Sequence, residues 1–143
     1  MPSRYRSRQT ALQILYLCDQ RQLPADQAIA SYYDSLSSEE AEPVNERDPF
    51  AEDLASGVLS DQGAIDALIA QFAENWRMER MAVVDRNILR LAVHEMRNLA
   101  TPAAVVIDQA LDLAEKFSGD NATGFINGVL DAVNNHLNAS KYA

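Results

Sequence analysis

Apolar residues recur at helical spacing along almost the whole chain, and this periodicity is the strongest constraint on its fold. The clearest stretch lies between Thr101-Pro102, a typical helix start, and Gly119, a typical helix stop. Between them the apolar residues follow spacings of three and four: Ala103, Val106, Ile107, Ala110, Leu111, Ala114 and Phe117. We find no convincing alternation of apolar and polar residues of the kind a β-strand shows. The sequence therefore predicts an all-α fold.

Similar patterns predict about seven helices in total. The other six are expected from Arg4–Arg8 to about Gln20, over about 24–36, from Pro49, from Ile65 to about Trp76, over about 80–97, and from Asp120 or Asn121 onward. Residues 37–48 are acidic and include Pro43, so they are predicted to form a surface loop.

The charge is unevenly distributed. The net charge of −9 argues against nonspecific nucleic-acid binding by the whole surface. Residues 1–21, however, contain four arginines and one acid, and residues 76–97 contain five arginines and three acids. An acidic segment, 22–75, with twelve acids and one arginine, separates them. A local basic patch is all that RNA binding requires.

The residue types that catalysis needs are sparse. Cys18 is the only cysteine, so an internal disulfide and a cysteine-rich zinc site are excluded, which fits a reducing cytoplasm. His94 and His136 have no partners at metal-ligand spacing, and there is no phosphate-binding or nucleophile motif. No apolar run approaches the roughly 20 residues of a membrane span. We expect a cytoplasmic binding protein without catalytic activity, metal, cofactor or membrane contact.

Two basic segments are candidates for RNA contact. In Arg4-Tyr5-Arg6-Ser7-Arg8 the guanidinium groups can pair with phosphates, but a frayed, solubilising terminus explains the same residues equally well. Arg86, Arg90, His94 and Arg97 form a stripe on one face of a predicted helix. For this stripe, ion pairs with the acidic middle segment are the favoured interpretation.

The turn from Phe117 to Phe125 is the third candidate. It joins two predicted helices, and the start of the second exposes amide groups that suit phosphate oxygens. Phe125 follows Gly124, so a base could approach the backbone beside an aromatic ring. On spacing alone, Phe125 is better explained as the beginning of a buried helix face.

Three segments together resemble one protein family in their order and spacing. They are Arg4 to Tyr16, Val84 to Met96, and Pro102 to Ala132, in which Phe125-Ile126-Asn127-Gly128-Val129-Leu130-Asp131 is the most specific stretch. The chain resembles the NusB family of bacterial transcription antitermination factors. This resemblance implies two small helical subdomains packed at an angle, at about 1–77 and 78–143.

The resemblance also implies a function and its residues. Family members bind the boxA element of ribosomal RNA leader transcripts with NusE, join other Nus factors on RNA polymerase, and suppress Rho-dependent termination. The positions that match RNA contacts are Arg4, Arg6, Arg8, Phe117, Asn121 and Phe125. Tyr16 and Asp85 match positions that face NusE. Asn121 and Gly124 depart from the acid and lysine that the family often has there.

The sequence leaves three alternatives open. NusB-like domains also occur fused to ribosomal RNA methyltransferases, so the chain could be an accessory module of such an enzyme. It could also be a homodimer that hides its RNA site, or a factor in ribosome assembly.

Overall fold

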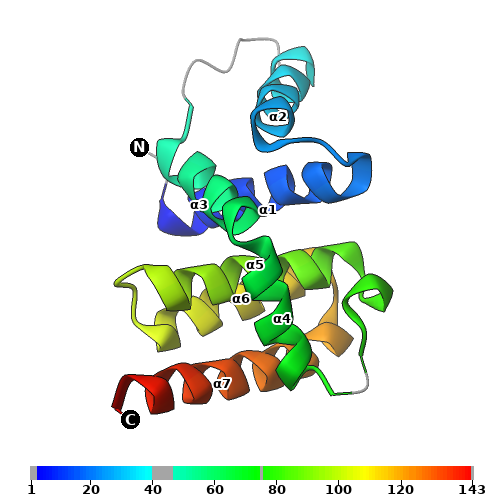
Figure 1. The fold of residues 1–143 in the computed structure, drawn as a ribbon. Helices are drawn as coiled ribbons and strands as arrows, with labels where there is room; N and C mark the ends of the chain where they lie inside the picture. Colours follow the sequence, from blue (N-terminus) through cyan, green and yellow to red (C-terminus); the bar gives the residue numbers. More distant parts are fainter. Residues whose placement is uncertain (1–2, 40–46, 75, 143) are drawn as a thin grey trace.

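The computed structural model describes residues 3–39, 47–74 and 76–142, and this part of the chain is helical without any strand. The helices are α1 (Arg4–Arg21), α2 (Ala25–Glu39), α3 (Pro49–Ser60), α4 (Gln62–Phe72), α5 (Val83–Asn98), α6 (Ala103–Phe117) and α7 (Asp120–Tyr142), with a 3₁₀ turn at Met78–Arg80 (Figure 1). The all-α prediction is confirmed. Most of the predicted loop 37–48 lies outside the described residues, and α2 extends into its first three positions.

Local capping explains several helix boundaries. The Ser3 side chain accepts a hydrogen bond from the Arg6 amide at 3.1 Å, so α1 begins directly at the arginine-rich segment. Gly119 has a φ of +127°, which separates α6 from α7 as predicted. The predicted cap at Thr101 is wrong, because Pro102 occupies the cap position. The Thr101 hydroxyl instead donates to the buried Glu95 carboxylate at 3.4 Å.

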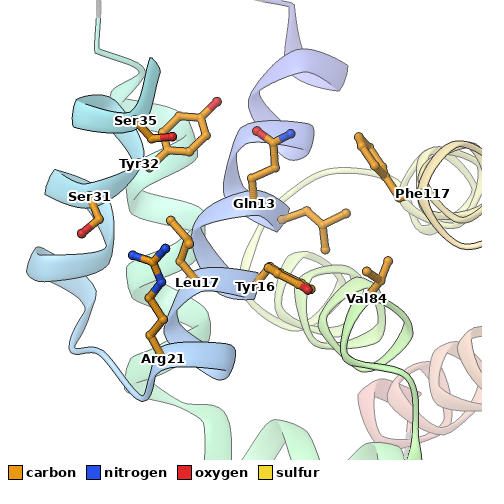
Figure 2. A pocket seen from close by; sticks show the side chains of 10 residues that line it. Gln13, Tyr16, Leu17, Arg21, Ser31, Tyr32, Ser35, Val84 and Phe117 are labelled. Atoms are coloured by element: carbon orange, nitrogen blue, oxygen red, sulfur yellow. The ribbon is translucent and has the colours of Figure 1, made fainter. Parts of the chain in front are cut away.

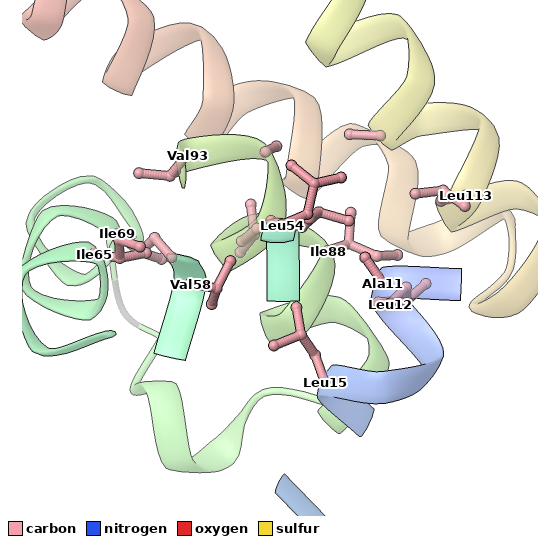
Figure 3. Close-up of a cluster of buried hydrophobic side chains, with 14 of the residues drawn as sticks. Ala11, Leu12, Leu15, Leu54, Val58, Ile65, Ile69, Ile88, Val93 and Leu113 are labelled. Carbon is pink, nitrogen blue, oxygen red and sulfur yellow. The ribbon is translucent and has the colours of Figure 1, made fainter. Parts of the chain in front are cut away.

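Helix α5 lies at the centre and packs against α1, α3, α4, α6 and α7 (Figure 1). Every residue from Asn87 to Glu95 is buried, so this helix has no solvent-facing side over that stretch. The cluster in Figure 3 shows apolar side chains of α1, α3 and α4 gathered around it, including Leu15, Leu54 and Ile69. The described helices therefore share one continuous core.

The subdomain boundary expected near residue 77 stays a prediction. Helices α1, α2 and α3 pack on one another, whereas α4 packs on α5 and α7 and lies with the C-terminal helices in Figure 1. We propose that the boundary falls near Asp61, between α3 and α4. No helix in the described part of the chain is long and apolar enough to cross a membrane.

Close packing between α3 and α5 makes Gly57 the first position to test. A Cβ atom at Gly57 would lie 2.5 Å from Nε2 of the buried His94 ring, so one of them must move. We expect Gly57→Ala to destabilise the fold by about 1–3 kcal/mol. The matched control is Gly63→Ala on α4, where nothing lies within 4 Å, and a gain of about 0.5–1 kcal/mol is expected there. Urea unfolding of both variants checks this, and equal gains would contradict it.

Candidate nucleic-acid interface

The start of α1 presents two arginines, Arg4 and Arg6, to solvent. The first turn contains no acidic residue, and its backbone is ordered by the Ser3 cap. The N-terminal end of a helix carries a partial positive charge and therefore attracts anions. Two exposed guanidinium groups at this end strengthen the attraction, so the segment is suited to phosphate.

Arg4 is held in place by an aromatic ring. Its guanidinium carbon lies 3.6 Å from the centroid of the Phe50 ring, at the start of α3. A guanidinium stacked on a ring loses little of its donor capacity, because its N–H groups lie in its own plane. Phe50 therefore orients Arg4 without neutralising its charge.

Arg8 is buried, unlike the exposed Arg4 and Arg6. It is 4% exposed, and its Nε and Nη2 donate to the two Glu95 carboxylate oxygens at 2.7 and 2.8 Å. Its third contact, at 3.4 Å, is with the Gln109 side chain on α6. Arg8 lies one turn further into α1 than Arg4, where that helix packs against α5. This burial argues against Arg8 as a direct phosphate contact and makes it a structural residue.

The basic stripe on α5 is occupied by ion pairs, as the favoured interpretation predicted. Arg90 pairs with Asp66 at 2.8 Å, and Arg97 pairs with Asp61 at 2.6 Å; both acids belong to the acidic segment. His94 is buried, which lowers its pKa although the nearby Glu95 and Asp61 charges oppose the shift. It therefore stays neutral at pH 7 and adds no charge for phosphate.

Asp19 on α1 is a partner that the sequence did not suggest. It accepts from Arg86, from Arg90 at 3.0 Å and from Asn87 at 3.0 Å. Burial opposes its ionisation, but hydrogen bonds from Arg86 and Asn87 and the charges of Arg86 and Arg90 outweigh it and lower the Asp19 pKa. The hydrogen bond between Arg86 and Asp19 is also the main cause that raises the pKa of Arg86. These ion pairs stabilise the packing of α1 against α5. Arg86 and Arg90 therefore have structural partners and are not free to contact phosphate.

The turn between α6 and α7 places its predicted residues beside a small pocket. Asn121 is exposed, and Phe125 is half-buried against the core. Both line a pocket of about 290 Å³ together with Trp76 and Asp85. The Trp76 ring lies 5.6 Å from the Phe125 ring, centroid to centroid. Trp76 was missed as a site residue; the available signal was a large aromatic residue at the end of a predicted helix.

A larger groove joins a predicted RNA residue to a predicted partner residue. Tyr16 of α1, which is 40% exposed, and Phe117 of α6 both line a groove of about 470 Å³, as do Leu17, Tyr32 and Val84 (Figure 2). Asp85, the other predicted partner residue, follows Val84 on α5, and its carboxylate accepts the Ser118 hydroxyl at 2.5 Å. The groove thus reaches the turn where Phe117 and Ser118 lie.

Lys116 connects the two regions predicted to contact RNA. This exposed side chain donates to the Gln9 side chain of α1 at 3.4 Å, and its Nζ lies 5.5 Å from the Phe117 ring centroid. A further cation therefore lies between α1, at Gln9, and the turn after α6. Sequence reasoning missed Lys116, because a single lysine near a helix end is unremarkable by itself.

Comparisons with known proteins agree along the chain. The NusB family model matches residues 5–135. The transcription antitermination protein NusB of Solibacter usitatus (strain Ellin6076) is 53% identical over 96% of this chain and 92% of its own length. NusB of T. maritima has a similar fold, with a TM-score of 0.77 at 28% identity over 94% of this chain and 92% of that one. A chain in the crystal structure of antitermination factors NusB and NusE in complex with dsRNA is also similar in fold, with a TM-score of 0.78 at 26% identity. This similarity covers 94% of the present chain and 99% of that one.

Proposed function

Because the chain belongs to the NusB family, we propose that it is a transcription antitermination factor that binds boxA RNA together with NusE. Its relatives carry that name, and a similar chain has been solved with NusE and double-stranded RNA. In this role it acts in the cytoplasm with other Nus factors on RNA polymerase and suppresses Rho-dependent termination. It works by binding and not by catalysis.

One observation supports this proposal most strongly: Lys116, beside Phe117 at the end of α6, donates to Gln9, which lies three residues after the exposed Arg6 on α1. Arg4 and Arg6 supply positive charge at a helix start, and Lys116 extends that charge toward Phe117. Phosphate contacts at the first region position the RNA, and contacts with bases at the second region distinguish sequences. The acidic remainder of the surface restricts binding to this strip.

The groove that contains Tyr16 and Phe117 is the proposed site for NusE. It is lined by apolar and aromatic side chains from α1, α2, α5 and α6 and also by the polar side chains of Gln13, Arg21, Ser31 and Ser35, as Figure 2 shows. It adjoins the RNA strip at Phe117. Asp85 follows Val84, which lines this groove, and itself lines the adjoining smaller pocket beside Phe125. A partner bound there would meet the RNA at Phe117 and complete its binding site.

Replacing both exposed arginines tests the phosphate contacts. We expect the double variant Arg4→Ala/Arg6→Ala to weaken boxA binding and to make its affinity less dependent on salt. The slope of log affinity against log salt should become less negative by about 1.4, since each phosphate contact with a single strand contributes about 0.7. Filter-binding titrations at several salt concentrations measure the slope. Arg21→Ala, in the last turn of the same helix, is the matched control and should keep the wild-type slope; because Arg21 lines the groove proposed for NusE, these titrations use the chain without NusE. An unchanged slope in the double variant would remove the arginines from the RNA site.

A further inference from the structure

Trp76 is the most exposed of the large apolar side chains that the structure describes, with 54% of its surface accessible. It lies between α4 and the 3₁₀ turn at Met78–Arg80, and its ring is tilted by 52° from the ring of Phe125. An exposed tryptophan keeps a large apolar face in water, which is unfavourable unless that face is covered on binding. The proposed RNA contacts involve Phe125 and Asn121 but give Trp76 no role.

The pocket beside Trp76 is small and has two kinds of wall. Trp76, Met81 and Phe125 form its apolar side, while Asp85, Ser118 and Asn121 form a polar edge. Its volume of about 290 Å³ lies just below the usual range for ligand sites, which begins at about 300 Å³. A single planar group fits that size better than a segment of protein.

The polar edge disfavours phosphate. The Asp85 carboxylate accepts the Ser118 hydroxyl at 2.5 Å and keeps a negative charge at the pocket, which repels a phosphate group. A carboxylate accepts hydrogen bonds, so it selects a group that carries N–H donors. The exposed Asn121 amide can both donate and accept. The Trp76 and Phe125 rings lie 5.6 Å apart, which is too close for a base to fit between them, so a nucleobase would stack on the exposed face of Trp76 with its hydrogen-bonding edge toward these polar groups.

We propose that Trp76, supported by Phe125, stacks on one unpaired base of the RNA, with Asp85 and Asn121 at its hydrogen-bonding edge. The proposal rests on the proposed function and adds to it a base-binding pocket, a stacking residue and a preference for a base with N–H donors at its edge. The pocket adjoins the turn from Phe117 to Phe125, so RNA that follows the proposed strip reaches it. Asp85 then contacts RNA in addition to any contact with NusE.

Trp76 is the only tryptophan in the chain, so its fluorescence reports directly on the pocket. We expect a boxA RNA oligonucleotide to quench this fluorescence. Replacing each nucleotide in turn by an abasic one should identify a single position at which the quenching disappears. Because that change keeps the phosphate, the salt slope at this position should stay as in the intact RNA.

Two substitutions at Trp76 separate stacking from folding. Trp76→Leu should weaken RNA binding roughly tenfold, the effect of losing one stacked base. Trp76→Phe keeps an aromatic face and should bind within about threefold of wild type, since stacking depends on that face. In each variant, the difference in affinity between intact RNA and RNA that is abasic at the identified position should shrink. The decrease should be larger in the variant that loses more affinity. Circular dichroism and thermal unfolding check that both remain folded.

The possible results distinguish this proposal from the proposed function. If boxA RNA does not bind the wild-type chain, with or without NusE, both proposals fail. If RNA binds normally but neither quenches Trp76 nor distinguishes Trp76→Leu from wild type, the base pocket is wrong and the proposed function stands. If Trp76→Leu weakens binding of NusE and leaves RNA affinity unchanged, the pocket belongs to the protein partner and the inference is overturned.

Discussion

Arg8→Ala is expected to reduce the free energy of unfolding by about 3–5 kcal/mol, because it leaves a buried carboxylate without its partner. Glu95 is 1% exposed and accepts two hydrogen bonds from the Arg8 guanidinium. Its remaining contact, from the Thr101 hydroxyl at 3.4 Å, is too weak to replace them. Urea unfolding monitored by circular dichroism measures the loss.

Two further variants make this first prediction specific. Arg6→Ala, two residues away on the same helix, removes an exposed arginine and should change stability by less than about 0.5 kcal/mol. Arg8→Met/Glu95→Leu removes both charges and should recover much of the stability lost in Arg8→Ala, because apolar residues often replace a buried ion pair at little cost. If Arg8→Ala were as stable as wild type but bound RNA weakly, Arg8 would belong to the RNA surface after all.

Asp19→Ala is the second large effect, with an expected loss of about 2–3 kcal/mol. Asp19 accepts from Arg86, Arg90 and Asn87, and its removal leaves two cations of α5 without their partner on α1. The loss should be smaller than for Arg8, because Arg90 keeps its pair with Asp66 and the Asp19 side chain is 11% exposed. The same unfolding experiment measures it, with Asp26→Ala, an exposed acid in the first turn of α2, as the control.

The contribution of Asp19 should also depend on pH. The pKa of Asp19 is lower in the folded chain than in the unfolded one, so its stabilising effect is complete above the unfolded pKa of about 3.9. As the pH falls through the lowered pKa, the carboxylate is protonated and that stabilisation is lost. The difference in stability between wild type and Asp19→Asn should therefore shrink between about pH 5 and pH 2. A difference that stays constant over this range would contradict the assigned role.

The helices could be predicted from the sequence because their apolar faces are periodic and their ends carry recognisable residues. Asp48-Pro49 illustrates this: the Asp48 side chain accepts from the Ala51 amide at 3.1 Å, and α3 begins at Pro49. Thr101-Pro102 has the same signature but a different outcome. The Thr101 hydroxyl is drawn to the buried Glu95, and such a tertiary contact cannot be inferred from a local motif.

The burial of the charged residues on α5 could not be predicted from the sequence. Arg90 and Glu95 look like the solvent-facing side of an amphipathic helix, yet both are buried because α5 is surrounded. Their partners, Asp19, Asp66 and Arg8, lie on other helices, and a single sequence does not specify which charges meet. The same limit applies to Arg8, whose sequence context is that of its exposed neighbours Arg4 and Arg6.

The candidate site was predicted in part. The residues of the turn after α6 could be named through the family resemblance, and the structure places Asn121 and Phe125 at one pocket. Trp76 and Lys116 were not named, because only the tertiary structure shows that the Trp76 ring lies beside Phe125 and that Lys116 contacts Gln9 of α1. Whether the named residues contact RNA or NusE stays a prediction.

A gel-shift titration of boxA RNA with the wild-type chain, with and without NusE, is the most direct test of whether this chain binds boxA together with NusE. We expect modest binding by the chain alone, tighter binding once NusE is added, and a preference for boxA over a scrambled RNA of the same composition. Binding should weaken as salt is raised, because local phosphate contacts supply much of the affinity. Equal binding of boxA and scrambled RNA, with no effect of NusE on either, would show that the chain does not recognise boxA together with NusE.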